Sequence, residues 1–126
     1  MCPGSIEFGK AAEKTAAGFL KTRGYKILEC NYKNKFGEID IIARQGRVIC
    51  FLEVKARNSL ELGRPQESVS ISKQKKICRV ALEYLKNRQL LGQPARFDVV
   101  GLLYRKDLPD ITLITDAFEL GGEFTV

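Results

Sequence analysis

The stretch "GEIDIIARQGRVICFLEVK", which begins at Gly37, limits the fold of this chain more than any other segment. Two β-prone runs, Glu38–Ala43 and Val48–Ala56, are separated by a short polar connection. That connection, Arg44–Arg47, contains Gly46, which can adopt the positive φ that a tight turn needs. The pattern predicts an antiparallel hairpin, so the fold must contain a sheet.

Helical and strand-like patterns lie on both sides of this hairpin. In chain order they predict a helix over Ile6–Arg23, a strand over Tyr25–Tyr32, a long polar loop over 57–70, a helix from Ser70 or Ser72 to Asn87, and strands over Arg96–Tyr104 and Ile111–Phe118. The run "DVVGLL" suits an interior strand that is covered on both faces. We therefore expect an α/β fold in which a mixed five-stranded sheet is flanked by helices, in the order α-β-β-β-α-β-β, with 57–70 as the most mobile segment.

Length and charge limit the number of domains and the kind of partner. The chain has 126 residues, 44% of them hydrophobic, which suits one compact core, so 1–126 is expected to be a single domain. A net charge of +6 favours a polyanionic partner, with nucleic acid ahead of an anionic membrane surface. The start of the chain lacks a secretory pattern, and no apolar run approaches the ~20 residues that span a bilayer. We expect a cytoplasmic protein with no membrane partner and with its four cysteines reduced.

Charged residues occur in the hairpin at positions where apolar residues would be less costly. Strand side chains alternate in direction, so Glu53 and Lys55 share one face of the second arm. A two-residue loop at Gln45–Gly46 or at Gly46–Arg47 would put Asp40 on the side of Glu53. A loop with an odd number of residues and no bulge would separate the two acids.

Acids that are clustered among apolar residues need a compensating cation, because like charges repel and buried carboxylates resist ionisation. The chain contains no histidine, so a metal would be held by oxygen atoms, which suits Mg²⁺ or Mn²⁺ better than zinc. Asp40 and Glu53 are the candidate direct ligands, and the Val54 carbonyl is a candidate third oxygen. The corresponding reaction is the metal-assisted attack of water on a phosphodiester, in which Lys55 could act as general base, water positioner or phosphate clamp.

Glu13 lies at the edge of the apolar stripe of the first expected helix. If this helix packs beside the hairpin, Glu13 could reach the same metal directly or through a water molecule. Without that packing, an ion pair with Lys10 or Lys14 on the helix surface explains the residue equally well.

The motif "GEID", twelve residues and then "EVK" resembles the PD-(D/E)XK nuclease signature in the variant found in archaeal Holliday junction resolvases. Ile39 and Asp40 stand where the nominal signature has its proline and first aspartate, as the resolvase-like variant allows. From "GKAAEKTAAGFLKTRGYKILECNY" through "RFDVVG", the chain is similar to the bacterial YraN-like family of predicted endonucleases. The resemblance implies a restriction-endonuclease-like fold and DNA cleavage, with branched or structured DNA as the implied substrate. By position it implies the following roles: Glu13, Asp40 and Glu53 as acidic metal-site residues, Lys55 as the catalytic lysine, and Glu38 in support.

Basic residues recur in the second expected helix and just before it. Lys73, Lys76 and Arg57 are candidate contacts for DNA phosphates, and Gln74 is a further candidate that could face the site. A charge run on a helix is also what ordinary solvation produces. Arg96 and Asp98 fit a structural pair between strands.

Three functions remain compatible with these patterns. A metal-dependent endonuclease leads, and a catalytically silent nucleic-acid-binding module on the same fold is the alternative. A small RNA- or ribosome-associated protein comes third, because no RNA-recognition motif is visible. A junction-resolving enzyme would need two active sites, so a homodimer is also expected if branched DNA is the substrate.

Overall fold

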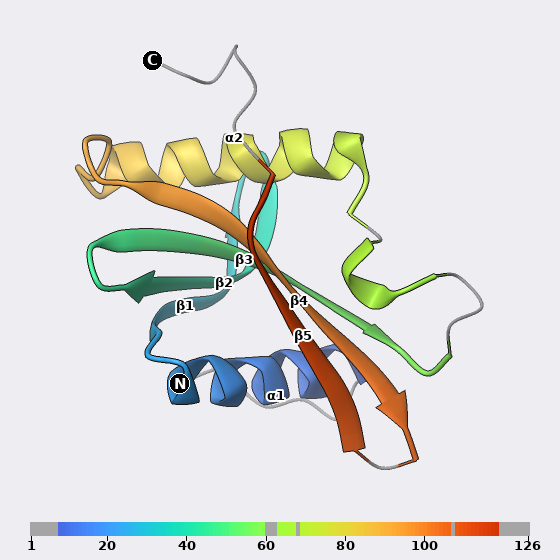
Figure 1. Cartoon of the computed structure of the whole chain (residues 1–126). Helices are drawn as coiled ribbons and strands as arrows, with labels where there is room; N and C mark the ends of the chain where they lie inside the picture. The colour runs from blue at the N-terminus through green and yellow to red at the C-terminus, as the bar shows by residue number, and fades with distance from the viewer. Residues whose placement is uncertain (1–7, 60–62, 68, 107, 119–126) are drawn as a thin grey trace.

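A five-stranded mixed sheet lies between two α-helices (Figure 1). The computed structural model describes residues 8–59, 63–67, 69–106 and 108–118. In chain order the elements are α1 (Phe8–Thr22), β1 (Lys26–Asn34), β2 (Gly37–Gln45), β3 (Val48–Arg57), the short 3₁₀ helix η1 (Pro65–Glu67), α2 (Ile71–Asn87), β4 (Ala95–Arg105) and β5 (Leu108–Phe118). The predicted order of helices and strands is therefore confirmed.

The strands lie side by side in their chain order, β1-β2-β3-β4-β5. Only the β3–β4 pair is parallel, and the other three pairs are antiparallel. A parallel pair needs a long crossover, which here is the segment containing η1 and α2. Residues 97–103 of β4 are all buried, as expected for an interior strand.

Each face of the sheet has its own apolar cluster, because successive side chains of β2 and β3 point to opposite faces. On the α2 face, Ile42 and Phe51 pack with the buried side of the helix, which includes Tyr84. On the α1 face, Ile41 and Leu52 pack with Ala16, Ala17 and Leu20. Both helices are thus fixed to the strands of the hairpin, one from each side.

A two-residue loop, Gly46–Arg47, joins β2 to β3, since Gln45 pairs with Val48. Gly46 has φ +60, which a type II′ turn requires at its first loop position. This is the second of the two predicted loops, so the even-numbered connection is confirmed. It fixes the register of the whole hairpin.

Gly24 ends α1 as predicted. It has φ +87, and the Tyr25 and Gly24 N–H groups donate to the carbonyls of Leu20 and Lys21, which is a Schellman motif. At the other helix, Ser70 is the N-cap of α2, because its hydroxyl accepts from the Lys73 N–H. Ile6, the expected start of the first helix, lies outside the described residues.

The segment 57–70 contains more regular structure than expected. Arg57 is the last residue of β3, and η1 contributes a buried proline, Pro65. Residues 60–62 and 68 lie outside the described part, so the expected mobility of this segment stays a prediction.

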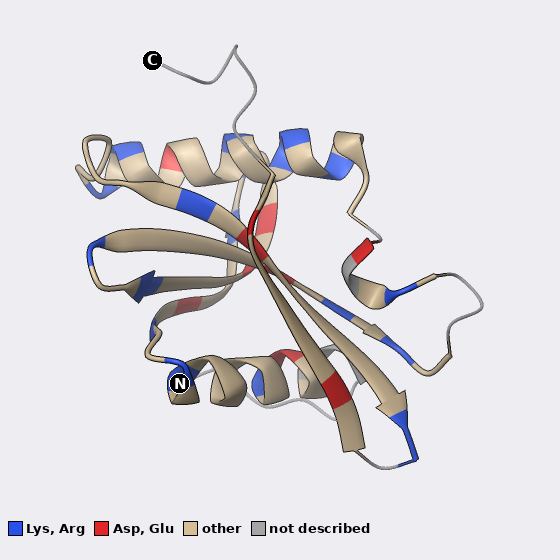
Figure 2. Ribbon diagram, in the orientation of Figure 1, with Lys and Arg blue, Asp and Glu red and all other residues tan. Residues whose placement is uncertain are grey.

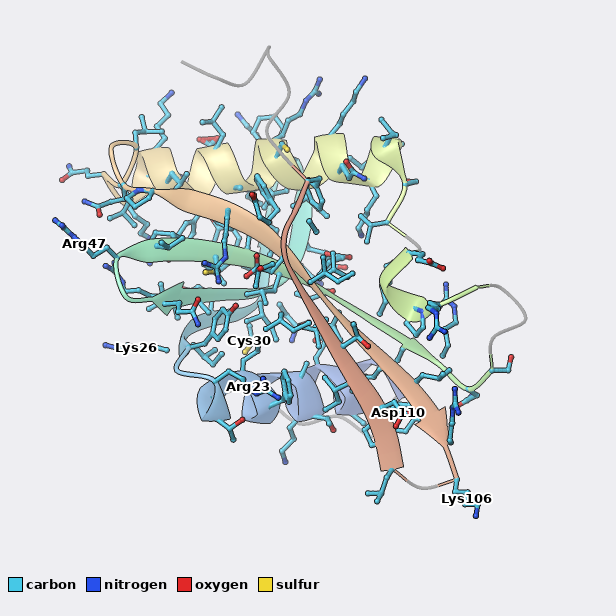
Figure 3. The ribbon with its side chains drawn as sticks, in the orientation of Figure 1. Arg23, Lys26, Cys30, Arg47, Lys106 and Asp110 are labelled. Atoms are coloured by element: carbon cyan, nitrogen blue, oxygen red, sulfur yellow. The ribbon has the colours of Figure 1, made fainter. Side chains whose placement is uncertain are left out.

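The expectation that all cysteines are reduced is wrong for Cys30, which is disulfide-bonded and lies on the side of the sheet that faces α1 (Figure 3). Cys50 and Cys78 are free and buried. None of the helices in the described ranges is long and apolar enough to cross a membrane.

Candidate functional site

Asp40 and Glu53 lie just beyond the point where the ladder between β2 and β3 ends. The last paired residues are Ile41 and Leu52, and the same register places Asp40 opposite Glu53. The Val54 N–H donates to Asp40 Oδ2 at 2.8 Å. The Asp40 carboxylate therefore bridges the two strands where backbone pairing has stopped.

Both carboxyl groups are costly to ionise in this position. Burial is the main cause for Glu53, which is 4% exposed, and the charge of Asp40 adds to it, so that the pKa of Glu53 is raised to about 7. Burial also raises the pKa of Asp40, although the hydrogen bond from Val54 and the charge of Lys73 act in the opposite direction. Two acids with raised pKa values at one place form the kind of site where function is often found.

A lysine from α2 approaches this acid pair. Lys73 Nζ lies 3.3 Å from Glu53 Oε1, and the side chains are 37% and 5% exposed respectively. Lys73 thus connects the first turn of α2 to the centre of the sheet. The sequence indicated Lys73 only as a candidate phosphate contact and gave no sign of this ion pair.

Lys55 is half-buried, and its charge lowers the pKa of both Asp40 and Glu53, as a neighbouring cation should. It follows Glu53 by two residues on β3, so alternation puts both on the same face. Glu38 is more exposed and lies 4.0 Å from Lys33 Nζ. Its contribution to the pKa of Asp40 is a small increase through charge repulsion.

Glu13 is half-buried on α1, the helix on the opposite side of the sheet from α2 (Figure 1). Within the described ranges, no three acidic, histidine or cysteine side chains come close enough together to hold a metal ion. The structure brings Asp40 and Glu53 together but does not add Glu13 to them as a third member. A role for Glu13 at the metal stays a prediction.

The other candidate contacts to DNA lie on β3 and α2, along which basic residues recur (Figure 2). Arg57 Nη1 donates to the Ala56 carbonyl, and Arg57 Nε is buried with no hydrogen bond to the described residues. Gln74 Nε2 donates to the Val69 carbonyl at 3.1 Å, which ties it to the helix start. Lys76 is exposed on α2, three residues after Lys73.

A second polar cluster, which is partly buried, joins the segment after the end of α1 to β2 and β4. Arg96 Nε donates to both oxygens of Asp98, at 3.0 and 3.1 Å, and Arg96 Nη2 donates to Tyr25 Oη and Gln45 Oε1. Arg96 and Asp98 form the structural pair that was expected, but within β4 and not between two strands. Burial, followed by the charge of Asp98, raises the pKa of Tyr25 to about 12. The cluster holds the end of α1 to the sheet.

The comparisons with known proteins give this chain a family. Residues 12–102 match a family model described as "Uncharacterised protein family UPF0102". The chain belongs to the UPF0102 family. The matched region of UPF0102 includes Glu13, Glu38, the whole hairpin and the start of α2 with Lys73.

Several curated UPF0102 proteins are similar to this chain over most of their length. The UPF0102 protein of Syntrophus aciditrophicus is 47% identical over 116 residues, which cover 92% of this chain and 91% of that protein. The one of Geotalea uraniireducens is 49% identical over 113 residues, covering 89% of each. The one of Dictyoglomus turgidum is 48% identical over 97 residues, covering 77% of this chain and 82% of that protein.

Proposed function

We propose that this UPF0102 protein is a metal-dependent endonuclease that hydrolyses DNA phosphodiester bonds. The observation that carries the proposal is the pair of half-buried Asp40 and buried Glu53, placed opposite each other at the point where β2 and β3 separate, with Val54 donating to Asp40. The resemblance of "GEID" and "EVK" to the PD-(D/E)XK signature supports the same activity, a restriction-endonuclease-like fold, and branched or structured DNA as the substrate class.

The residues of the pair suit a small, hard cation. Their carboxylates and the Val54 carbonyl are oxygen donors, and burial without a divalent ion raises the pKa of both acids. Mg²⁺ commonly uses one or two carboxylates and completes its shell with water and substrate phosphate, so a third acid is not required. When bound, Mg²⁺ or Mn²⁺ would supply Lewis-acid polarisation of the scissile phosphate.

The remaining roles belong to side chains of the protein. Asp40 and Glu53 would hold the cation, and the Val54 N–H fixes the orientation of Asp40. Lys55 holds the phosphate and positions the attacking water from the same face as Glu53. The water oxygen forms a new bond to phosphorus and one ester P–O bond breaks; the proton that the water gives up passes to solvent, and the leaving oxygen takes up a proton from solvent.

Cleavage assays with matched variants test this function. Purified protein is incubated with linear, single-stranded, flapped and four-way-junction DNA in Mg²⁺, in Mn²⁺ or in EDTA. We expect cleavage that depends on the metal, and we expect Asp40→Asn, Glu53→Gln and Lys55→Gln to reduce its rate by at least about 100-fold. Asp110→Asn is the matched control, because Asp110 is an exposed acid on β5 that pairs with Arg105.

Two outcomes would overturn the proposal. Cleavage that survives Asp40→Asn and Glu53→Gln would assign the activity to another site or to a contaminant. A wild-type protein that binds DNA in the presence of metal but never cuts any of the four substrates would instead be a nucleic-acid-binding module on this fold.

A further inference from the structure

Lys73 occupies a position that is unfavourable for α2 itself. It is the third residue of the helix after the Ser70 N-cap, in a first turn that contains no acidic residue. The positive end of the helix dipole repels a cation there, and an acid is the usual choice at this position. A local rule that is broken in this way often marks a functional residue.

The structure shows what compensates for this position. Lys73 Nζ lies 3.3 Å from Glu53 Oε1, while the Lys73 backbone N–H is held by the Ser70 hydroxyl at 3.1 Å. The Glu53 side chain is 5% exposed and cannot move into solvent without disturbing β3, whereas the Lys73 side chain is 37% exposed. Of the two partners, Lys73 is therefore the one that can swing away.

We propose that Lys73 is a displaceable counter-ion of the acid pair: its ammonium group occupies Glu53 until a divalent cation binds there, and it then turns outward to a DNA phosphate. This inference rests on the proposed metal-dependent nuclease and adds a coupling between its cation and its substrate. Coupling of this kind is reciprocal, so the cation strengthens DNA binding and DNA strengthens cation binding by the same factor.

Electrostatics give the direction of the effect. The ammonium group of Lys73 repels a metal cation that comes close to it. The cation must also break the Lys73–Glu53 pair before it can bind Glu53 Oε1. Removing the charge of Lys73 should therefore tighten cation binding to the protein alone. If the lysine only held Glu53 in place, its removal would weaken cation binding or leave it unchanged.

Calorimetry with Mn²⁺ and the full chain, without DNA, tests the first half of the proposal. We expect Lys73→Gln to raise the Mn²⁺ affinity about tenfold, and we expect Lys73→Arg, which keeps the charge, to stay close to wild type. Lys75→Gln is the matched control, since Lys75 is an exposed lysine of the same helix, two residues after Lys73. An unchanged or lower affinity in Lys73→Gln would overturn the inference while leaving the nuclease proposal intact.

Two further binding measurements distinguish failure of this inference from failure of the proposed nuclease function on which it rests. If Glu53→Gln binds Mn²⁺ as tightly as wild type, the cation does not use this acid, and both proposals fail. With Ca²⁺ and uncleaved four-way-junction DNA, the cation should increase the DNA affinity of wild type and of Lys75→Gln several-fold more than that of Lys73→Gln. An equal gain in all three proteins would rule out a phosphate contact by the released lysine.

Discussion

Glu53 is placed so that its ionisation opposes folding. The unfolded carboxyl group releases its proton near its ordinary value of 4.5, whereas burial and the nearby Asp40 raise the pKa of the folded group to about 7. The native state therefore binds more protons between these values, and the free energy of unfolding should fall as pH rises from about 5 to 8, by up to about 3 kcal/mol. The charges of Lys73 and Lys55 lower the pKa of Glu53 and so reduce the effect without reversing it.

Urea denaturation of metal-free protein in EDTA, followed across this pH range, measures that slope. Glu53→Gln should remove most of the slope and should be more stable than wild type at pH 8. A wild-type stability that is flat between pH 5 and 8, or a variant with an equally steep slope, would contradict the raised pKa.

Arg96 is a partly buried residue that stabilises the fold through its hydrogen-bond and charge partners. The Asp98 side chain is completely buried, and Arg96 neutralises it while also reaching Tyr25 and Gln45. Arg96→Met would leave that carboxylate without its charge partner, so we expect a loss of about 3–5 kcal/mol in the free energy of unfolding.

Arg105→Met provides the comparison for Arg96→Met. The Arg105–Asp110 pair has side chains that are 63% and 69% exposed, so its removal should cost about 1 kcal/mol or less. Equal effects of the two variants in urea denaturation would show that the buried cluster is not a major source of stability.

At the level of the elements, a residue just after the end of α2 has a strained backbone conformation that a substitution can relieve. Gln89 has φ +58, and the N–H groups of Leu90 and Gln89 donate to the carbonyls of Leu85 and Lys86 in a Schellman motif. Glycine adopts this conformation without the Cβ penalty, so Gln89→Gly should stabilise the protein by about 1 kcal/mol. Lys86→Gly, three residues earlier and inside the helix, should destabilise it by a similar amount, and thermal unfolding of both variants distinguishes the two effects.

The hairpin was predictable from the sequence because a single residue type decides its register. Gly46 allows only a few turns, and an even-numbered loop brings Asp40 opposite Glu53. The Lys73–Glu53 pair was not predictable, because it depends on where α2 starts above the sheet after a long polar segment. The same holds for Tyr25 and Arg96, which are far apart in the chain and meet only when β4 pairs with β3.

At the scale of the whole molecule, the order of elements followed from periodicity alone, but the positions of the two helices did not. Alternating apolar residues in β2 and β3 show that both faces are covered, without showing which helix covers which face. That assignment matters for Glu13. The sequence left the role of Glu13 open and only the resemblance put it at the metal; the structure places it on α1, on the other side of the sheet from α2, which carries Lys73.

The net charge of +6 gives no indication of where DNA would bind under the proposed function, and salt dependence can locate such a contact. If DNA lies over the acid pair, each neighbouring cation that meets a phosphate adds about one unit to the slope of log affinity against log salt. Lys76→Gln and Arg57→Gln should each reduce that slope by about one.

Arg47 lies at the other end of β3 from Arg57 (Figure 3), about 30 Å away for a ten-residue strand, so Arg47→Gln should leave the slope unchanged. Fluorescence anisotropy with junction DNA between 50 and about 200 mM salt measures all three slopes. A slope that falls for Arg47→Gln but not for the other two would move the DNA to the turn end of the hairpin, away from Asp40 and Glu53.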